Sequence, residues 1–153
     1  MDVRSRESID EAAQQVETLL DEYGLELFCL ICNAGIGPDC HSELISVENA
    51  LNIVNTNYIG TLFACKRFVG RVNRDKGRIL LTSSATFRLI IPPLADYTSS
   101  KAAIASLATC LNKSPGRYGA SCRCVCPGDP ITRTNVVNYS ATFIPEVLEV
   151  TSK

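Results

Sequence analysis

The sequence predicts an α/β fold built on a parallel sheet. Three apolar stretches at 25–32, 78–83 and 121–126 have the length of strands, and stretches with helical spacing precede each of them. The resulting order of helix, strand, helix, strand, helix and strand is typical of parallel strands joined by right-handed crossovers. A chain of 153 residues with 46 % apolar side chains is expected to form one globular domain, 1–153.

The first helix is predicted over residues 8–23, where apolar side chains recur at helical spacing and Gly24 supplies the stop. Ser8 and Glu11 are spaced as a capping box, which predicts that the helix starts at Ser8. The strand that follows is almost continuously apolar, a pattern that favours a parallel sheet covered on both faces. It ends in Asn33-Ala34-Gly35, where small residues allow a ligand to approach the backbone.

A long helical stretch is predicted from about residue 46 to residue 72. Poor helix formers interrupt its apolar period at 55–57 and at Gly60, so we expect a kink or a functional break there. The segment 85–96 contains two adjacent prolines and is predicted to be a loop. Apolar residues return at helical spacing over 97–112, which predicts the last helix.

Composition and charge exclude several classes of protein. The net charge of −1, with neither a basic block nor an acidic tail, gives no reason to expect binding to nucleic acid or to a membrane surface. No apolar run is long enough for a transmembrane segment, and the charged N-terminus lacks the apolar core of a signal peptide. We therefore expect an intracellular, cytoplasmic protein whose eight cysteines are reduced.

Two cysteine patterns favour core packing over chemistry. Cys29 and Cys32 form a CxxC motif inside an apolar strand, whereas redox-active pairs lie at the start of a helix. Cys122, Cys124 and Cys126 alternate along a strand and face one side, so a metal site would need further ligands from other positions. We expect neither a redox pair nor a metal site.

Tyr97 and Lys101 are the first candidates for chemistry. They are four residues apart, so on a helix they share one face with Cβ atoms about 5–6 Å apart. A free phenol has a pKa of about 10 and exchanges protons poorly at neutral pH. An ammonium nearby lowers that pKa and makes the tyrosine a usable acid or base. This spacing alone more often indicates a solvent-exposed helix face than a catalytic pair. Residues elsewhere in the chain are needed to distinguish the two.

Small or polar residues end all three predicted strands, at Asn33-Ala34-Gly35, Thr82-Ser83-Ser84 and Pro127-Gly128. Parallel strands place their carboxyl ends along one edge of the sheet, and ligands bind beyond that edge in open α/β folds. Tyr97 and Lys101 begin the helix that comes after Ser84. We therefore expect all of these residues to lie at one edge.

In these residues the sequence resembles the classical short-chain dehydrogenase/reductase (SDR) family, in order and over nearly the whole chain. Tyr97 and Lys101 match the family's YxxxK pair, and Ser84 lies thirteen residues before Tyr97, the usual spacing of its catalytic serine. Asn57, three residues before Gly60, matches the active-site asparagine of its long helix. The resemblance implies four catalytic residues, Asn57, Ser84, Tyr97 and Lys101.

The resemblance also implies where a dinucleotide cofactor would lie. Asp2-Val3 is similar to the pair that contacts the adenine, and Asn33-Ala34-Gly35 is similar to the turn that lines the cofactor cleft. Pro127-Gly128 with Thr132 is similar to the segment beside the nicotinamide. The implied cofactor-binding residues are Asp2, Val3, Asn33, Ala34, Gly35, Tyr97, Lys101, Pro127, Gly128 and Thr132. The implied cofactor is NAD or NADP.

The activity implied by the resemblance is that of an NAD(P)-dependent oxidoreductase, which interconverts an alcohol and a carbonyl by hydride transfer. Ser84 would orient the substrate oxygen, Tyr97 would act as the general acid/base, and Lys101 would lower the Tyr97 pKa and bind the nicotinamide ribose. Asn57 would hold a water that relays protons to Lys101. The apolar loop 85–96 hints at a lipophilic alcohol or carbonyl.

The family's glycine-rich turn, which seats the pyrophosphate at a helix N-terminus, has no match in this sequence. We therefore expect a partial Rossmann-like, doubly wound parallel sheet that is truncated at its N-terminal side. Its first strand would then carry an exposed apolar edge or face.

Two functions stay open at this point. One is the oxidoreductase, and the other is a truncated, catalytically inactive chain that acts only as an interaction or oligomerisation module. In either case the resemblance implies a homo-oligomer formed through the helices that carry Asn57 and Tyr97.

Overall fold

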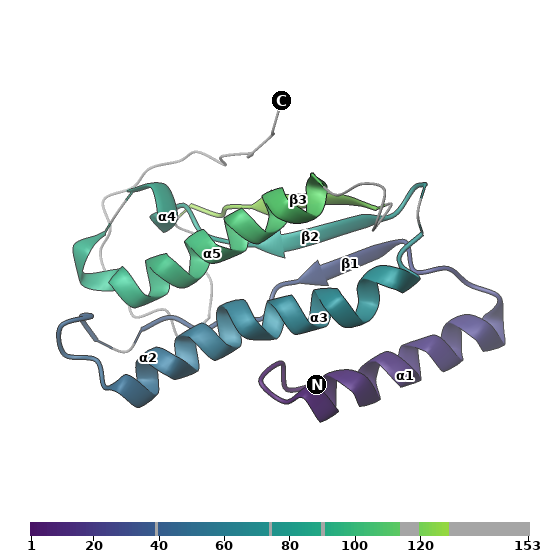
Figure 1. The fold of residues 1–153 in the computed structure, drawn as a ribbon, viewed down its shortest axis with the longest axis horizontal. Coiled ribbons are helices and arrows are strands. Elements are labelled where there is room, and N and C mark those ends of the chain that lie inside the picture. The colour runs from purple at the N-terminus through teal and green to yellow at the C-terminus, as the bar shows by residue number, and fades with distance from the viewer. Residues whose placement is uncertain (39, 74, 90, 114–119, 129–153) are drawn as a thin grey trace.

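The computed structural model describes residues 1–38, 40–73, 75–89, 91–113 and 120–128. Its strands β1 (Cys29–Cys32), β2 (Arg78–Thr82) and β3 (Ser121–Val125) form one parallel sheet in the order β1-β2-β3 (Figure 1). The helices are α1 (Arg6–Tyr23), α2 (Val47–Val54), α3 (Gly60–Phe68), α4 (Thr86–Leu89) and α5 (Ala95–Asn112). The predicted α/β architecture with a parallel sheet is therefore confirmed.

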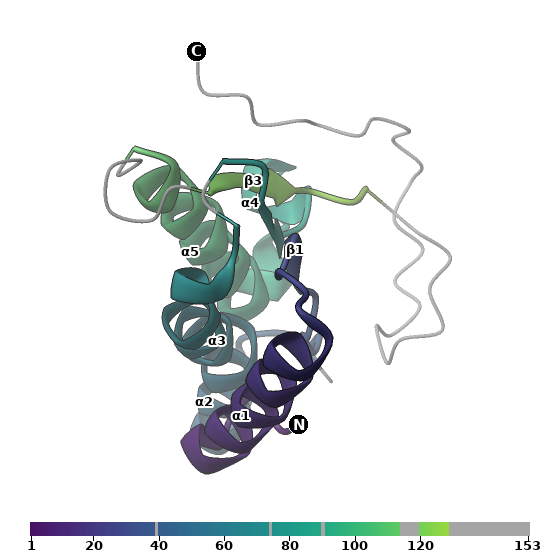
Figure 2. The same ribbon diagram turned by 90° about the vertical axis from the view of Figure 1, so that its right-hand side faces the viewer.

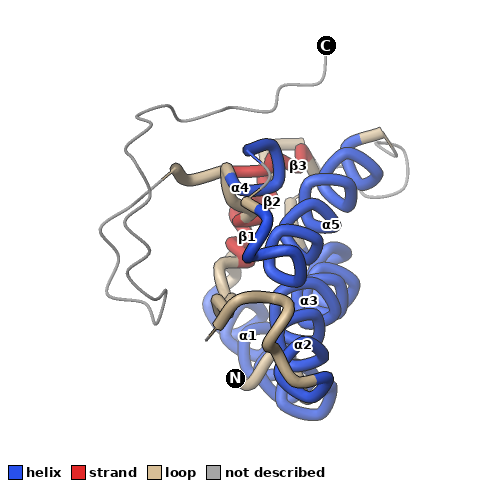
Figure 3. The backbone as a smooth tube through the Cα atoms, turned by 90° about the vertical axis from the view of Figure 1, so that its left-hand side faces the viewer, coloured by secondary structure: helices blue, strands red, loops and turns tan. Residues whose placement is uncertain are grey.

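Three of these helices form one layer beside the sheet. α3 packs on β1, α5 packs on β2 and β3, and α1 packs on α3. Figure 2 shows this layer from its end, with α1, α3 and α5 on the same side of the strands, and Figure 3 shows it from the opposite end. None of the helices in the described part of the chain is long and apolar enough to cross a membrane.

The far face of β1 is open in the described part of the chain. Ile31, which faces away from the helix layer, is 62 % exposed, and Phe28 just before the strand is exposed as well. The prediction that this strand is covered on both faces is therefore wrong for β1, while the predicted exposed apolar face is confirmed. The strand is also shorter than its apolar run, because Leu27 makes only an isolated bridge to Val72.

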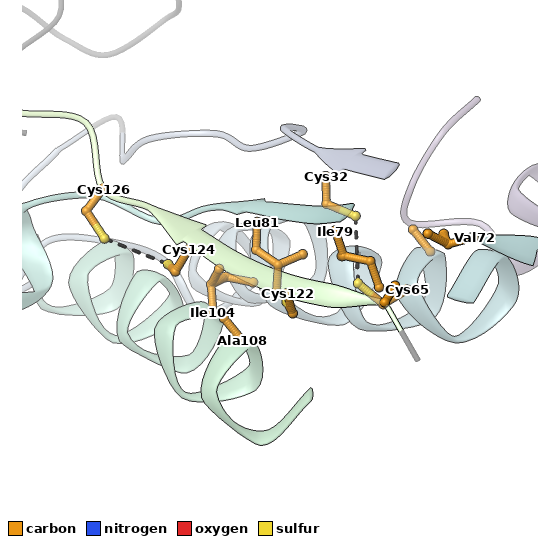
Figure 4. Packing of buried hydrophobic residues seen from close by; sticks show 12 residues of the cluster. Cys32, Cys65, Val72, Ile79, Leu81, Ile104, Ala108, Cys122, Cys124 and Cys126 are labelled. Carbon is orange, nitrogen blue, oxygen red and sulfur yellow. Dashed lines mark hydrogen bonds between the residues drawn. The ribbon is translucent and has the colours of Figure 1, made fainter. Parts of the chain in front are cut away.

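The core lies between the sheet and the helix layer, and cysteines fill much of it (Figure 4). Cys122, Cys124 and Cys126 are buried, as predicted for core residues, and the sulfurs of Cys124 and Cys126 lie 3.7 Å apart. The sulfur of Cys32 lies 3.7 Å from that of Cys65 on α3. Cys29 lies on the opposite face of β1 because side chains alternate along a strand, so the CxxC spacing does not form a thiol pair.

α1 begins two residues earlier than predicted. Its N-cap is Ser5, whose side chain accepts a hydrogen bond from the backbone N–H of Ser8, so the start predicted at Ser8 is wrong. Ser8 instead accepts a hydrogen bond from the backbone N–H of Asp2, 2.8 Å away. The predicted stop is confirmed, because Gly24 caps the helix in the left-handed conformation with φ of 62°.

The predicted break in the long helix is confirmed as a π-helical turn, Asn55–Ile59, inserted between α2 and α3. Such a turn adds one residue to the helical repeat and is frequent at functional sites. The segment 85–96 is not a simple loop, because it contains α4 and a short 3-10 turn, Pro92–Leu94. α5 begins at Ala95, so Tyr97 lies in its first turn.

Replacing Gly24 by alanine is expected to destabilise the protein by about 1 kcal/mol, because an L side chain disfavours the left-handed backbone. Nothing lies within 4 Å of the position that the new Cβ would take, so the loss would come from the backbone alone. The matched control is Gly70→Ala, which also meets no atom within 4 Å but has no positive φ. Urea unfolding of both variants measures the difference, and equal stabilities would contradict this interpretation.

Candidate functional site

Ser84 and Tyr97 meet at the carboxyl edge of the sheet. Ser84 lies two residues beyond the end of β2 and is buried. Its hydroxyl oxygen accepts hydrogen bonds from the backbone N–H of Thr86, at 3.3 Å, and from the Thr86 hydroxyl, at 3.0 Å. Ser84 also lies near enough to the Tyr97 phenol to act on its pKa.

The pKa of Tyr97 is raised above its usual value, because burial penalises the phenolate, and the hydrogen bond from Ser84 opposes that shift. The expectation that Lys101 lowers this pKa is therefore wrong for this arrangement. The ammonium of Lys101 lies 5.7 Å from the centre of the Tyr97 ring and is hydrogen bonded elsewhere. Tyr97 is thus a protonated phenol at neutral pH.

Lys101 is a buried ammonium, with only 5 % of its surface exposed. It donates a hydrogen bond to the carbonyl of Thr82, the last residue of β2, at 3.0 Å. The hydroxyl of Ser83 donates to the backbone carbonyl of Lys101 at 2.6 Å, so the end of β2 holds this helical turn by two contacts. Burial lowers the pKa of Lys101, because the charged form loses hydration.

Asn57 lies in the π-helical turn and is 1 % exposed. Its amide oxygen accepts from the backbone N–H of Ile36 at 2.8 Å, and its amide nitrogen donates to the Ile36 carbonyl at 3.0 Å. The same nitrogen donates to the hydroxyl of Ser100 at 3.0 Å. The side chain therefore ties the turn after β1 to α5.

Gly35 brings that turn against the other site residues. A Cβ built on Gly35 would lie 3.1 Å from the ammonium nitrogen of Lys101 and 3.2 Å from the amide oxygen of Asn57. Asn33, Ala34 and Gly35 are all exposed, so their backbone is accessible at this edge. The structure thus brings together Asn57, Lys101 and the turn, next to the Ser84 and Tyr97 pair.

The other predicted cofactor residues lie around this centre. The backbone N–H of Ala85 donates to the Pro127 carbonyl at 2.9 Å, which places Pro127-Gly128 beside Ser84. Val3 packs on the first residue of α3, where a Cβ on Gly60 would lie 2.8 Å from the Val3 carbonyl oxygen. Thr132 lies outside the described residues.

Asp2 is exposed and already paired within the chain. The side chain of Arg4 donates to both of its carboxylate oxygens, at 3.1 and 2.9 Å, and the backbone N–H of Arg4 donates to one of them at 2.9 Å. These hydrogen bonds lower the pKa of Asp2 to about 2. An adenine contact at Asp2 would therefore use the acceptor sites that Arg4 leaves open.

Two buried serines of the site, Ser83 and Ser100, are not predicted as site residues from the sequence. Ser83 enters the sequence prediction only as one of the polar residues that end the second strand. Ser100 lies three residues after Tyr97 and four before Ile104, on the buried stripe of α5. A serine on such a stripe needs a hydrogen-bond partner, which is the signal that could have found it.

The buried Lys101 predicts a measurable pH dependence of stability. Its pKa is lower in the folded than in the unfolded chain, so between those two values the unfolded chain binds more protons. The free energy of unfolding contributed by Lys101 therefore rises with pH towards 10.5, the ordinary pKa of a lysine, by at most about 1.4 kcal/mol per pH unit. Comparing wild type with Lys101→Met by urea unfolding at a series of pH values isolates this contribution.

The control for that comparison is Lys66→Met, which removes an exposed lysine of α3. The free energy of unfolding of the wild type minus that of Lys101→Met is expected to increase with pH, and more steeply than the same difference taken with Lys66→Met. If the difference in free energy of unfolding has the same pH dependence for both variants, Lys101 is not a buried ammonium in solution.

Comparisons with known proteins identify the family of the chain. A family model for the short chain dehydrogenases matches residues 1–142. Two curated relatives are a 3beta-hydroxysteroid dehydrogenase of Caenorhabditis elegans and a mitochondrial D-beta-hydroxybutyrate dehydrogenase of Bos taurus. The first is 31 % identical, and the match covers 92 % of this chain and 36 % of the relative. The second is 27 % identical, and the match covers 89 % of this chain and 40 % of the relative.

Among solved structures, a dehydrogenase/reductase from Sinorhizobium meliloti is similar with a TM-score of 0.75 and 27 % identity, over 88 % of this chain and 51 % of that one. The chain thus spans about half or less of the length of the proteins it matches. Because the family match covers residues 1–142 of the 153-residue chain, the chain belongs to the short-chain dehydrogenase family.

Proposed function

We propose that the chain carries the proton-transfer site of an NAD(P)-dependent oxidoreductase that interconverts an alcohol and a carbonyl. The observation that carries this proposal is the placement of the buried Lys101 ammonium 5.7 Å from the centre of the Tyr97 ring, with Ser84 buried near the same phenol. All three lie at the carboxyl edge of a parallel sheet, where open α/β folds bind their ligands.

The residues present fit the nicotinamide and ribose end of a dinucleotide. Lys101 has three N–H donors, and within the described residues its hydrogen-bond acceptor is the Thr82 carbonyl, so donors remain for ribose hydroxyls. Gly35 leaves open the space in which a side chain would press on Lys101, and the backbone of Asn33-Ala34-Gly35 is exposed. Bound NAD or NADP would supply or accept the hydride.

The side chains would then divide the proton chemistry among them. In the direction of carbonyl reduction, the raised pKa of Tyr97 keeps its phenol protonated, so it can donate a proton to the substrate oxygen. Ser84 would donate a hydrogen bond from its hydroxyl to that oxygen and so orient it. Lys101, whose ammonium lies 5.7 Å from the centre of the Tyr97 ring, would bind the nicotinamide ribose beside the phenol.

Asn57 would act differently from the role that the family resemblance implies. Its amide is engaged by Ile36 and Ser100, so a relay water for Lys101 would have to bind at the remaining acceptor site of its amide oxygen or at the backbone. We therefore propose that its side chain mainly holds the site together.

A lipophilic substrate is the finer part of the proposal. Phe87 and Leu89 of α4 lie close in sequence to Ser84, and Leu89 is exposed. The names of the relatives mention a hydroxysteroid and a hydroxybutyrate, both of which carry a secondary alcohol. A cytoplasmic location stays a prediction from the sequence.

An interaction module without catalysis is the second candidate function, and the exposed apolar residues favour it. Val47 and Leu51 project from α2, and Ile31 and Phe28 are exposed at β1. Exposed apolar side chains that cluster on one element often mark an interface. We propose that two copies of the chain pair through the helix that contains α2 and the turn with Asn57, packed beside α5.

Turnover should depend on Tyr97 while cofactor binding should not. Tyr97→Phe removes the proton donor but keeps the ring, so kcat is expected to fall at least about a hundredfold while the Kd for NADH or NADPH changes little. Fluorescence titration of the reduced cofactor measures binding, and absorbance at 340 nm measures turnover. Residual turnover near the wild-type value would remove Tyr97 from this role.

The same titration separates the two candidate functions. Saturable binding of NADH or NADPH to the wild-type chain supports the oxidoreductase. If neither cofactor binds at millimolar concentration, the chain by itself is not the enzyme, and the interaction module becomes the function to test.

Leu51→Glu is expected to shift the chain from dimer to monomer, because it places a charge in the proposed helix interface. Leu51 is 55 % exposed, and the matched control Leu19→Glu changes an α1 residue that is 53 % exposed. Analytical ultracentrifugation measures the association state of all three proteins. A wild-type chain that is monomeric at 100 μM, or equal effects of the two variants, would overturn the proposed interface.

A further inference from the structure

We propose that Ser100 is a positioning residue that links the turn after β1 to the first turn of α5. Its hydroxyl joins the Asn57 side chain to the backbone carbonyl of Tyr97. Its effect on turnover rests on the proposed oxidoreductase function, whereas the link itself does not.

The directions of these hydrogen bonds follow from the donors available. The Ile36 N–H can only donate, so the atom of Asn57 that faces it, 2.8 Å away, must be the amide oxygen. The amide nitrogen then faces the Ile36 carbonyl and the Ser100 oxygen, each 3.0 Å away, and both of its protons are used. The orientation of this amide is therefore fixed by its partners.

The hydroxyl of Ser100 continues the chain in the same direction. Its oxygen accepts a proton from Asn57, and its own proton goes to the Tyr97 carbonyl, 2.7 Å away. The path thus runs from the Ile36 N–H through Asn57 and Ser100 to Tyr97, with every donor pointing the same way. Hydrogen bonds arranged in this way polarise and strengthen one another, most strongly in a buried site.

Burial makes the link necessary. Asn57 is 1 % and Ser100 is 3 % exposed, so water does not readily replace either partner. Without the Ser100 hydroxyl, one N–H of Asn57 would be buried and unpaired, which the amide could relieve only by moving. The amide oxygen and the Lys101 nitrogen lie 3.2 and 3.1 Å from the point where a Cβ of Gly35 would sit, so this movement would disturb the space between the turn and Lys101.

A simpler role for Ser100 makes a different prediction. A serine in a helix often donates to the carbonyl of the preceding turn, and that contact alone needs no partner outside the helix. If this were its whole role, removing the hydroxyl would disturb only α5. The proposed link instead predicts a disturbance at Ile36, which is 64 residues away in the sequence.

The test compares Ser100→Ala with Ser99→Ala, which removes an exposed hydroxyl from the neighbouring position of the same helix. In ¹⁵N NMR spectra, Ser100→Ala is expected to shift the side-chain amide signals of Asn57 and the backbone N–H of Ile36. Hydrogen exchange at Ile36 should become about tenfold faster than in the wild type. Ser99→Ala should leave both unchanged, and Ser100→Thr, which keeps a hydroxyl, should restore slow exchange at Ile36.

Changes confined to residues 95–112 in Ser100→Ala would overturn the proposed link, whether or not the chain is an active enzyme. If the wild-type chain turns over, Ser100→Ala should lower kcat about tenfold while the KM for the substrate changes less than twofold. If Ser100→Ala shifts the Ile36 N–H signal but leaves kcat unchanged, the positioning role is overturned. A wild-type chain without turnover would contradict the proposed function and leave the NMR result to decide the link.

Discussion

The burial of the Lys101 ammonium is the constraint on which the rest of the site depends. A charged group inside a protein is costly unless hydrogen bonds and partial charges replace its water. Here the carbonyl of Thr82 at the end of β2 supplies one such partner, and Ser83 fixes the backbone of the same helical turn. The ammonium can be held there because the parallel sheet stops at this point and leaves the carbonyls of its last residues available.

Two parts of the molecule differ in how completely they are packed. The helix side of the sheet is a closed core in which small side chains, including Cys65, Cys122 and Cys124, allow α3 and α5 to approach the strands. The opposite side leaves Ile31 exposed. The site belongs to the packed side, since Asn57, Tyr97 and Lys101 all come from helices of that layer, so its geometry does not depend on what covers the open face.

Sequence patterns predicted the elements better than their ends. The strands followed from apolar runs, and the break at Asn57 followed from poor helix formers, because both signals are local. The start of α1 could not be read correctly, since Ser5 and Ser8 are both good capping residues and only the fold decides which one caps. Whether both faces of β1 are buried could not be predicted either, because an apolar run does not show which face of the strand packs against a helix.

The pairing of Tyr97 with Lys101 shows most clearly where a local pattern stops being informative. Their spacing correctly put both side chains on one helical face, and it suggested that the lysine would lower the tyrosine pKa. Burial acts on both groups at once and favours the neutral form of each, so it raises the pKa of Tyr97 and lowers that of Lys101. Burial therefore keeps the Tyr97 phenol protonated and makes the Lys101 ammonium easier to deprotonate than in water. That property comes from the depth of the site, which depends on the sheet edge, the π-helical turn and α5 together.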